Sequence, residues 1–213
     1  MLERIPPREW RDLALAWFAI SIAFTLLYLD LGSPLSVSEY FRLFAISAVT
    51  VGIGFVAHEM AHKFTAMKYG FWAEFRKDNL MLLVAVVMAA FVHVVFAAPG
   101  ATMIAGSPTR EQNGRISAAG PFVNLVLCIP FLAMALLAFG TEGILWGIGI
   151  AGWQINAMLA GFNMLPVGPL DGKKVLAWNI PVFLALIAIS FVLVALSLSP
   201  GIIGAVTAGL PSL

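Results

Sequence analysis

Long apolar stretches separated by short polar segments dominate this sequence. A helix needs about 20 mainly apolar residues to cross the hydrocarbon core of a bilayer. Stretches near that length run from Leu13 to Leu29, from about Tyr40 to just before Tyr69, from Ile116 to Phe139, from Gly143 to Leu165 and from Ile180 to Leu198. The pattern predicts an all-α polytopic membrane protein with about five to six transmembrane helices.

A further apolar stretch, residues 79–98, is difficult to place. Its length of about 20 residues would by itself make it another crossing. The following segment, Pro99 to Gly106, is bracketed by turn-forming residues and is too short to cross as a helix, so we predict a short extended strand there. A polar loop, residues 107–115, leads from it into the next apolar stretch.

The distribution of basic residues decides between two placements of residues 79–98. If this stretch re-enters the membrane or lies along its surface, all of the twelve Lys and Arg residues except Arg42 fall on one side. If it crosses, the division becomes seven against five. The positive-inside rule favours the first arrangement and makes the basic side cytoplasmic. We therefore expect a re-entrant or interfacial helix at residues 79–98.

Composition agrees with a membrane protein and excludes several other classes. Hydrophobic residues make up 61% of the chain and charged residues 11%, whereas soluble domains contain about 25% charged residues. The single cysteine, Cys128, rules out an intrachain disulfide and a thiolate zinc site. A net charge of +1 without a long basic run gives no support to nucleic-acid binding.

The N-terminal region resembles a signal peptide in one respect only. Arg4, Arg8 and Arg11 precede the first apolar stretch. That stretch is longer than a usual signal h-region, and residues 28–30 offer no small-residue cleavage site, so we expect a retained helix. No polar segment is long enough for a second domain, and we expect one membrane-embedded domain, residues 1–213, with a catalytic core at about 40–178.

The segment His58-Glu59-Met60-Ala61-His62 carries the strongest chemical signal. On a helix, residues four apart lie on the same face, so both imidazoles can reach one metal ion. Glu59 lies at the edge of that face, where it can deprotonate the attacking water, as in the H-E-x-x-H arrangement of zinc proteases. The pattern is short enough to arise by chance, but its apolar context makes unpaired ionisable groups costly and favours a metal site.

A catalytic zinc takes three protein ligands and leaves one position open, so one ligand remains to be found. Asp171 directly follows an apolar stretch and, in the favoured topology, lies on the same side of the membrane as the two histidines. Glu74 and Asp78 compete with it, although their charged stretch is more simply a solvated interfacial turn. His93 is a lone histidine in an apolar run, typical of a buried hydrogen-bonded side chain.

Two asparagines, Asn124 and Asn163, lie within apolar stretches close to prolines. Intramembrane amides can simply hold helices together. An amide near the metal can instead bind a substrate backbone or a developing oxyanion. The residues alone favour neither role.

Three motifs together resemble the site-2 protease family of intramembrane zinc metalloproteases. They are His58-Glu59-Met60-Ala61-His62, Gly120-Pro121-Phe122-Val123-Asn124 and residues 163–172, with Asn163, Pro166 and Leu170-Asp171-Gly172, and they occur in the family's order. The resemblance covers roughly Val56 to Gly172.

This resemblance implies a set of roles. The zinc ligands are His58, His62 and Asp171, the catalytic base is Glu59, and the residues lining the substrate groove are Asn124 and Asn163. It also implies one Zn²⁺ per chain, cleavage of transmembrane protein substrates within the lipid bilayer, and a membrane-embedded strand at Pro99 to Gly106. The distribution of basic residues places the expected active site toward the cytoplasm. The sequence departs from the family in lacking a PDZ-like insert and a C-terminal regulatory domain, and residues 79–98 are additional.

Two other functions remain open at this stage. A metal carrier would also place ionisable residues inside the membrane. A proteolytically inactive scaffold would retain the fold and bind substrates without cleaving them. Glu59 separates protease from carrier, because only a protease has cleavage to lose when this carboxylate is replaced.

Overall fold

The structure is a computed structural model that describes residues 5–28, 36–93, 100–140 and 143–199. Its elements are α1 (Pro7–Tyr28), α2 (Val37–Lys68), β1 (Trp72–Lys77), α3 (Asn79–Val92), β2 (Gly100–Ala105), α4 (Arg110–Leu137), α5 (Ile144–Asn163), α6 (Asp171–Trp178) and α7 (Ile180–Ser197). The helices α1, α2, α4, α5 and α7 are long and apolar enough to cross a membrane. The prediction of an all-α polytopic membrane protein is therefore confirmed.

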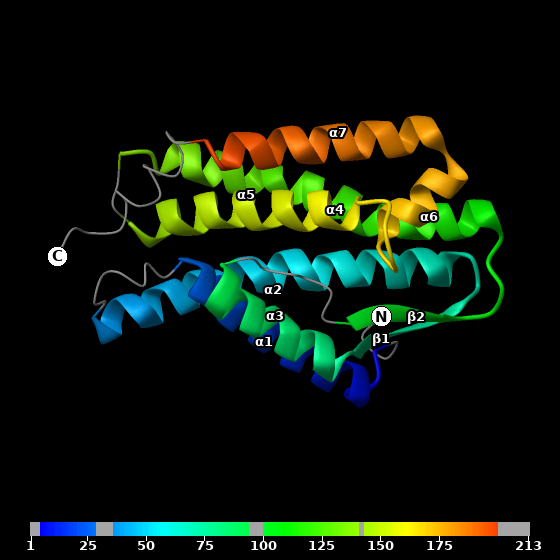
Figure 1. The fold of residues 1–213 in the computed structure, drawn as a ribbon, viewed down its shortest axis with the longest axis horizontal. Coiled ribbons are helices and arrows are strands. Elements are labelled where there is room, and N and C mark those ends of the chain that lie inside the picture. Colours follow the sequence, from blue (N-terminus) through cyan, green and yellow to red (C-terminus); the bar gives the residue numbers. More distant parts are fainter. Residues whose placement is uncertain (1–4, 29–35, 94–99, 141–142, 200–213) are drawn as a thin grey trace.

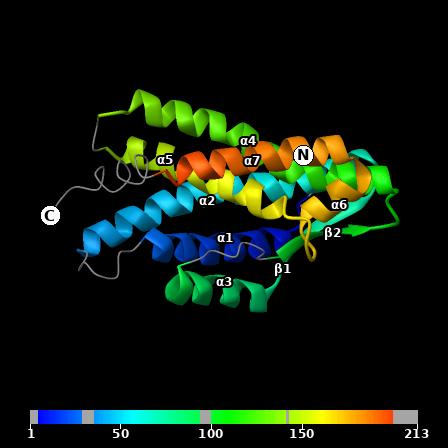
Figure 2. The same cartoon turned by 45° about the horizontal axis from the view of Figure 1, so that its top comes forward.

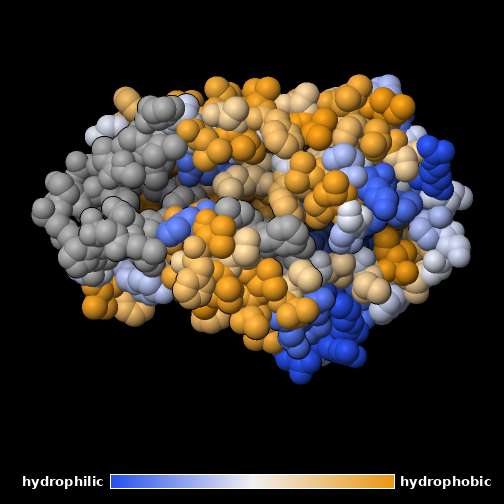
Figure 3. Space-filling view, viewed as in Figure 1, coloured by the Kyte–Doolittle hydropathy of each residue, from blue (hydrophilic) through white to orange (hydrophobic). Residues whose placement is uncertain are grey.

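The central helix of the bundle is α2, which packs against α1 on one side and against α4 and α5 on the other (Figure 1). A capping box formed by Ser36 and Glu39 starts α2, and Gly70, with φ 82°, follows its end. Hydrophobic side chains cover the middle of the bundle, whereas hydrophilic ones gather at the end that holds the sheet and α6 (Figure 3). This division matches helices that cross a bilayer and leave one polar end in water.

Helix α3 is too short to cross the membrane by itself. It has 14 residues, which gives it a length of about 21 Å, shorter than the roughly 30 Å hydrocarbon core. It lies along α1 at the edge of the bundle (Figure 2). Lys77, just before α3, pairs with Gly100 across the sheet, so the chain returns to the level from which it left. Among the described residues, this agrees with the re-entrant or interfacial placement; residues 94–98 of that stretch lie outside them.

The sheet consists of β1 and β2 in antiparallel order, with Phe75 opposite Thr102. The extended segment predicted at Pro99 to Gly106 is confirmed as β2, apart from Pro99, which lies outside the described residues. The expectation of a solvated turn at residues 74–78 is wrong. Phe75 and Glu74 are buried, and the strand forms because β2, which is distant in sequence, supplies its hydrogen-bonding partner.

Two helix boundaries and one short helix differ from the pattern of apolar residues. Helix α1 begins at Pro7, before the apolar stretch that starts at Leu13, and α4 begins at Arg110, inside the expected loop. A capping box between Thr109 and Gln112 stabilises that start of α4. The short helix α6 was not predicted, because a helix of 8 residues gives a weak periodic signal.

A buried ion pair fastens α1 to the end of α2. Glu9 is fully buried, and its carboxylate bonds the ammonium group of Lys63, which is 1% exposed. The other carboxylate oxygen of Glu9 accepts a 2.9 Å hydrogen bond from the main-chain N–H of Phe75 in β1. One carboxylate therefore holds α1, α2 and β1 together next to His62.

Replacing Glu9 by alanine should destabilise the protein strongly, because Lys63 would be left buried without its partner. Loss of one member of a buried pair costs about 3–5 kcal/mol. Thermal unfolding in detergent would measure this as a large drop in Tm. Glu111→Ala is the matched control, because it breaks the exposed pair with Arg115 and should leave Tm nearly unchanged.

Candidate metal centre

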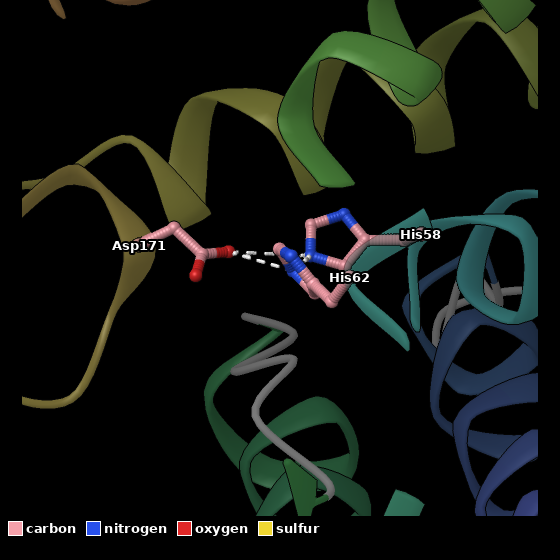
Figure 4. Close-up of side chains that lie close together, drawn as sticks. All are labelled: His58, His62 and Asp171. Atoms are coloured by element: carbon pink, nitrogen blue, oxygen red, sulfur yellow. Dashed lines mark hydrogen bonds and ion pairs between the residues drawn. The ribbon is translucent and has the colours of Figure 1, made fainter. Parts of the chain in front are cut away.

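The last turns of α2 bring His58 and His62 to the start of α6. Their Nε2 atoms are 3.0 Å apart. Oδ2 of Asp171 lies 3.4 Å from Nε2 of His58 and 3.1 Å from Nε2 of His62. All three side chains are buried and point toward one another (Figure 4). Two imidazoles and a carboxylate from distant parts of the chain therefore meet at one point.

The hydrogen bonds behind His58 fix which of its ring nitrogens carries the proton. Nδ1 lies 2.5 Å from Oδ1 of Asn124. The amide nitrogen of Asn124 donates to the carbonyl of Gly54 and to Oδ1 of Asn156, at 3.1 and 2.8 Å, so its oxygen must face the imidazole. Asn156 is held in turn by the carbonyl of Gly152. Nδ1 of His58 therefore donates, and the lone pair of Nε2 is available to a metal.

A carbonyl group orients the second imidazole in the same way. Nδ1 of His62 lies 2.8 Å from the main-chain oxygen of Ile116 in α4. A carbonyl oxygen only accepts, so this nitrogen carries the proton and Nε2 again faces the ligand cluster. Helix α4 therefore supplies the partners for both histidines, through an amide side chain and through its backbone.

Asp171 owes its position to the turn between α5 and α6. Gly168, with φ 56°, turns the chain after α5. Gly172 packs so closely on the carbonyl of Met164 that a side chain there would clash. Oδ2 of Asp171 thereby faces Nε2 of both histidines. A carboxylate oxygen is a ligand that zinc takes beside two imidazoles.

The competing ligand candidates lie elsewhere. Glu74 binds Arg76 at 2.6 Å, and Asp78 caps the start of α3 with its side chain. The expectation that His93 is buried is wrong, because it is exposed at the end of α3, where it adopts a left-handed φ of 54°. Within the described residues, the group of His58, His62 and Asp171 is the one cluster of such side chains that can hold a metal ion.

Glu59 and Asn163 face a cavity beside this cluster, whereas Asn124 does not. The cavity has a volume of about 720 Å³ and extends between α2, β2 and the turn before α6. Glu59 lines it with a carboxylate that accepts a 2.8 Å hydrogen bond from the hydroxyl of Thr102 in β2. Asn163 also lines it and donates to the carbonyl of Leu159. Asn124 is fully buried behind His58.

Strand β2 turns its outer edge toward this cavity, and no strand of the described residues pairs with that edge. The N–H of Phe75 donates to Glu9 and therefore points away from β2. In an antiparallel pair, two opposite residues either bond each other or both point outward. Thr102 lies opposite Phe75, so its main-chain N–H and C=O point away from β1, and by alternation those of Gly100 and Ile104 do as well.

Comparison with known proteins places the chain in a family. It is 39% identical over 177 residues to "Putative zinc metalloprotease MJ0611" of Methanocaldococcus jannaschii, covering 83% of this chain and 87% of that protein. The chain belongs to the site-2 protease family. This family member is also 31% identical to the similarly named Rip3 of Mycobacterium tuberculosis, and the match covers 78% of this chain and 38% of Rip3. It is 27% identical to the similarly named YwhC of Bacillus subtilis, and that match covers 70% of this chain and 72% of YwhC. No family model and no solved structure matches it.

The cofactor of this site-2 protease family member is zinc, and the cluster fits it. Tetrahedral zinc with bonds of about 2.0–2.1 Å separates its ligand atoms by about 3.3–3.4 Å. The observed separations of 3.0–3.4 Å are close to that spacing. Gly120 lines the same space, and a Cβ there would clash with Nε2 of both histidines. A glycine at this position therefore keeps open the volume that an ion needs.

Sequence reasoning missed Asn156, Ile116 and Thr102, which hold the candidate ligands and base. Asn156 gave a weak signal, as another amide within an apolar stretch. Ile116 contributes only its backbone, and Thr102 acts through a contact across the fold, so neither could be identified from residue type or spacing.

Removal of the Asn124 amide should weaken zinc binding. In Asn124→Leu, Nδ1 of His58 loses its acceptor, and loss of such a partner typically lowers metal affinity about 10- to 100-fold. Competition with a chromophoric zinc chelator measures the affinity directly. Cys128→Ala, a buried change one turn along α4, is the matched control and should leave it unchanged. Equal affinity in both variants would contradict the role of Asn124.

Proposed function

We propose that the protein is an intramembrane zinc metalloprotease that hydrolyses peptide bonds in or near transmembrane segments of membrane proteins, in regulated intramembrane proteolysis. One observation carries the proposal. His58, His62 and Asp171 converge within a bundle of membrane-crossing helices, and Glu59 faces the cavity beside them. Ligands, base and substrate space therefore meet at one place.

Each residue of the site has a defined task in this proposal. His58, His62 and Asp171 would hold the metal. Zinc bound there would act as a Lewis acid toward the scissile carbonyl and would make water more acidic. Glu59 removes the proton from the attacking water and delivers it to the leaving amine. Burial of Glu59 excludes bulk water and strengthens these charge interactions.

The substrate must be unwound, because the carbonyls of a transmembrane helix are hydrogen-bonded within the helix. We assign the free edge of β2 to binding the unwound segment as an added strand, through the outward groups of Gly100, Thr102 and Ile104. Asn163 lines the same cavity and is assigned to the substrate backbone. We assign Asn124 to holding His58 instead, because its side chain is buried behind that ligand.

We also propose that the site faces the cytoplasm and that the chain forms a single protease domain with its core at about 40–178. The support is the charge distribution. Because β1 and β2 return the chain to one level, the basic residues near the site share one side, and Arg42 near the start of α2 lies at the opposite end. An excess of Lys and Arg marks cytoplasmic segments.

Glu59→Gln should abolish cleavage and keep the metal. The amide cannot accept a proton, and loss of general base catalysis lowers the rate about 10²- to 10⁴-fold. The assay combines purified protein with a transmembrane peptide and measures zinc content in parallel. A zinc chelator should stop cleavage by the natural chain, and Glu111→Gln, on the exposed surface, should cleave normally.

Two outcomes would contradict the proposal. Cleavage that survives the chelator would exclude zinc chemistry at this site. A natural chain that binds zinc and cleaves no transmembrane peptide would favour a metal carrier or an inactive scaffold.

Proline at position 104 should weaken substrate binding and leave the sheet intact. The N–H of Ile104 points outward, so Ile104→Pro removes a donor to the substrate and none to β1. One hydrogen bond is worth about 1 kcal/mol, so KM should rise roughly fivefold with little change in Tm. Ile104→Ala controls for the lost side chain. Met103→Pro removes an N–H that points toward β1 and should instead lower Tm. An unchanged KM in Ile104→Pro would count against strand addition.

A further inference from the structure

Thr102 contacts the proposed base with its side chain and faces the substrate side with its main chain. Its hydroxyl donates to Oε2 of Glu59 at 2.8 Å and lies 3.3 Å from the main-chain oxygen of the same residue. Its N–H and C=O point to the free edge of β2, because Phe75 opposite it points outward to Glu9. No other residue in the described part of the chain is hydrogen-bonded to the Glu59 carboxylate.

We propose that Thr102 is a positioning residue that couples strand docking to the placement of the Glu59 carboxylate. The inference rests on the proposed function and names the device by which the same site is aligned. A substrate strand that bonds the main chain of Thr102 fixes β2 at that residue, and the hydroxyl then fixes Oε2 of Glu59. Oε1 is left to handle the proton.

The surroundings make this single hydrogen bond effective. Glu59 is 7% exposed, and a hydroxyl that donates to a buried carboxylate oxygen is worth more than the same hydrogen bond at the surface. Proton transfer also depends on placement within a few tenths of an ångström, and a carboxylate free to rotate about its side chain spends less time aligned.

The far side of the sheet is anchored to the same helix. Phe75, opposite Thr102, donates to Glu9, and Glu9 binds Lys63, which directly follows His62. The Phe75 and Thr102 pair is thus held to α2 on both sides of the metal-binding turn. A shift of β2 on substrate binding is therefore transmitted to the Glu59 carboxylate through Thr102, because the sheet as a whole is held in place.

Steady-state cleavage of a transmembrane peptide by Thr102→Val and Thr102→Ser tests the proposal. Valine matches threonine in shape and lacks the hydroxyl, so kcat should fall about 10- to 100-fold, while KM stays within about threefold and zinc content does not change. Serine keeps the hydroxyl and should restore kcat to within about threefold of the natural chain. Thr50→Val is the control, a buried threonine of α2 that bonds only its own helix.

A double-mutant cycle, measured by thermal unfolding, tests the contact between Thr102 and Glu59 without a cleavage assay. Thr102→Val should lower Tm in the wild-type background and lower it clearly less when Glu59 is already alanine, because the side-chain bond is then absent and only the 3.3 Å contact with the main-chain oxygen of residue 59 remains. Additive Tm changes would overturn the contact.

Three kinetic outcomes would overturn the coupling: an unaffected kcat in Thr102→Val, a change confined to KM, or a serine variant as impaired as the valine variant. If the natural chain cleaves no transmembrane peptide, the proposed function fails and the coupling falls with it. The double-mutant cycle still tests the contact between Thr102 and Glu59 in that case, so the two failures are distinguishable.

Discussion

A charged or polar side chain withdrawn from water must find its partner inside the protein, and this requirement organises the site end of the bundle. His58 meets Asn124, Glu59 meets Thr102, and Lys63 meets Glu9. Each pair joins α2 to a different element: α4, β2 and α1. The candidate metal-site residues and the residues that hold the fold are thus neighbours on one helix, and the cost of burying them is offset by the same contacts that align them.

This arrangement explains why a small sheet occurs in a helical membrane protein. Helices satisfy their own backbone groups and offer no main-chain partner to a bound peptide. In the proposed function, the β1 and β2 pair would supply such partners beside the cavity that Glu59 lines. The N–H of Phe75 in β1 bonds Glu9, whereas the outer edge of β2 lines the cavity. The candidate metal cluster, Glu59 and this edge therefore lie around one cavity.

Local features of the fold could be predicted from the sequence, and features created by distant contacts could not. The lengths of the apolar stretches predicted the five helices that can cross a membrane, and the four-residue spacing of His58 and His62 predicted two imidazoles on one helix face. Each of these features depends on a single segment of the chain. Strand β1 was missed because its charged residues look solvated until β2 lies beside them. Asn156 was missed for the same reason: its relation to His58 runs through Asn124 and exists only when α2, α4 and α5 are packed.

The pairing of Lys77 with Gly100 has a consequence for how this architecture can vary. Both ends of the segment between Lys77 and Gly100 lie side by side. The length of that segment therefore has no effect on the orientation of the helices that follow it. A lineage could shorten it to a tight hairpin turn or enlarge it into a separate module, and α4 to α7 would keep their direction through the bilayer. Diversity at this position is therefore topologically neutral.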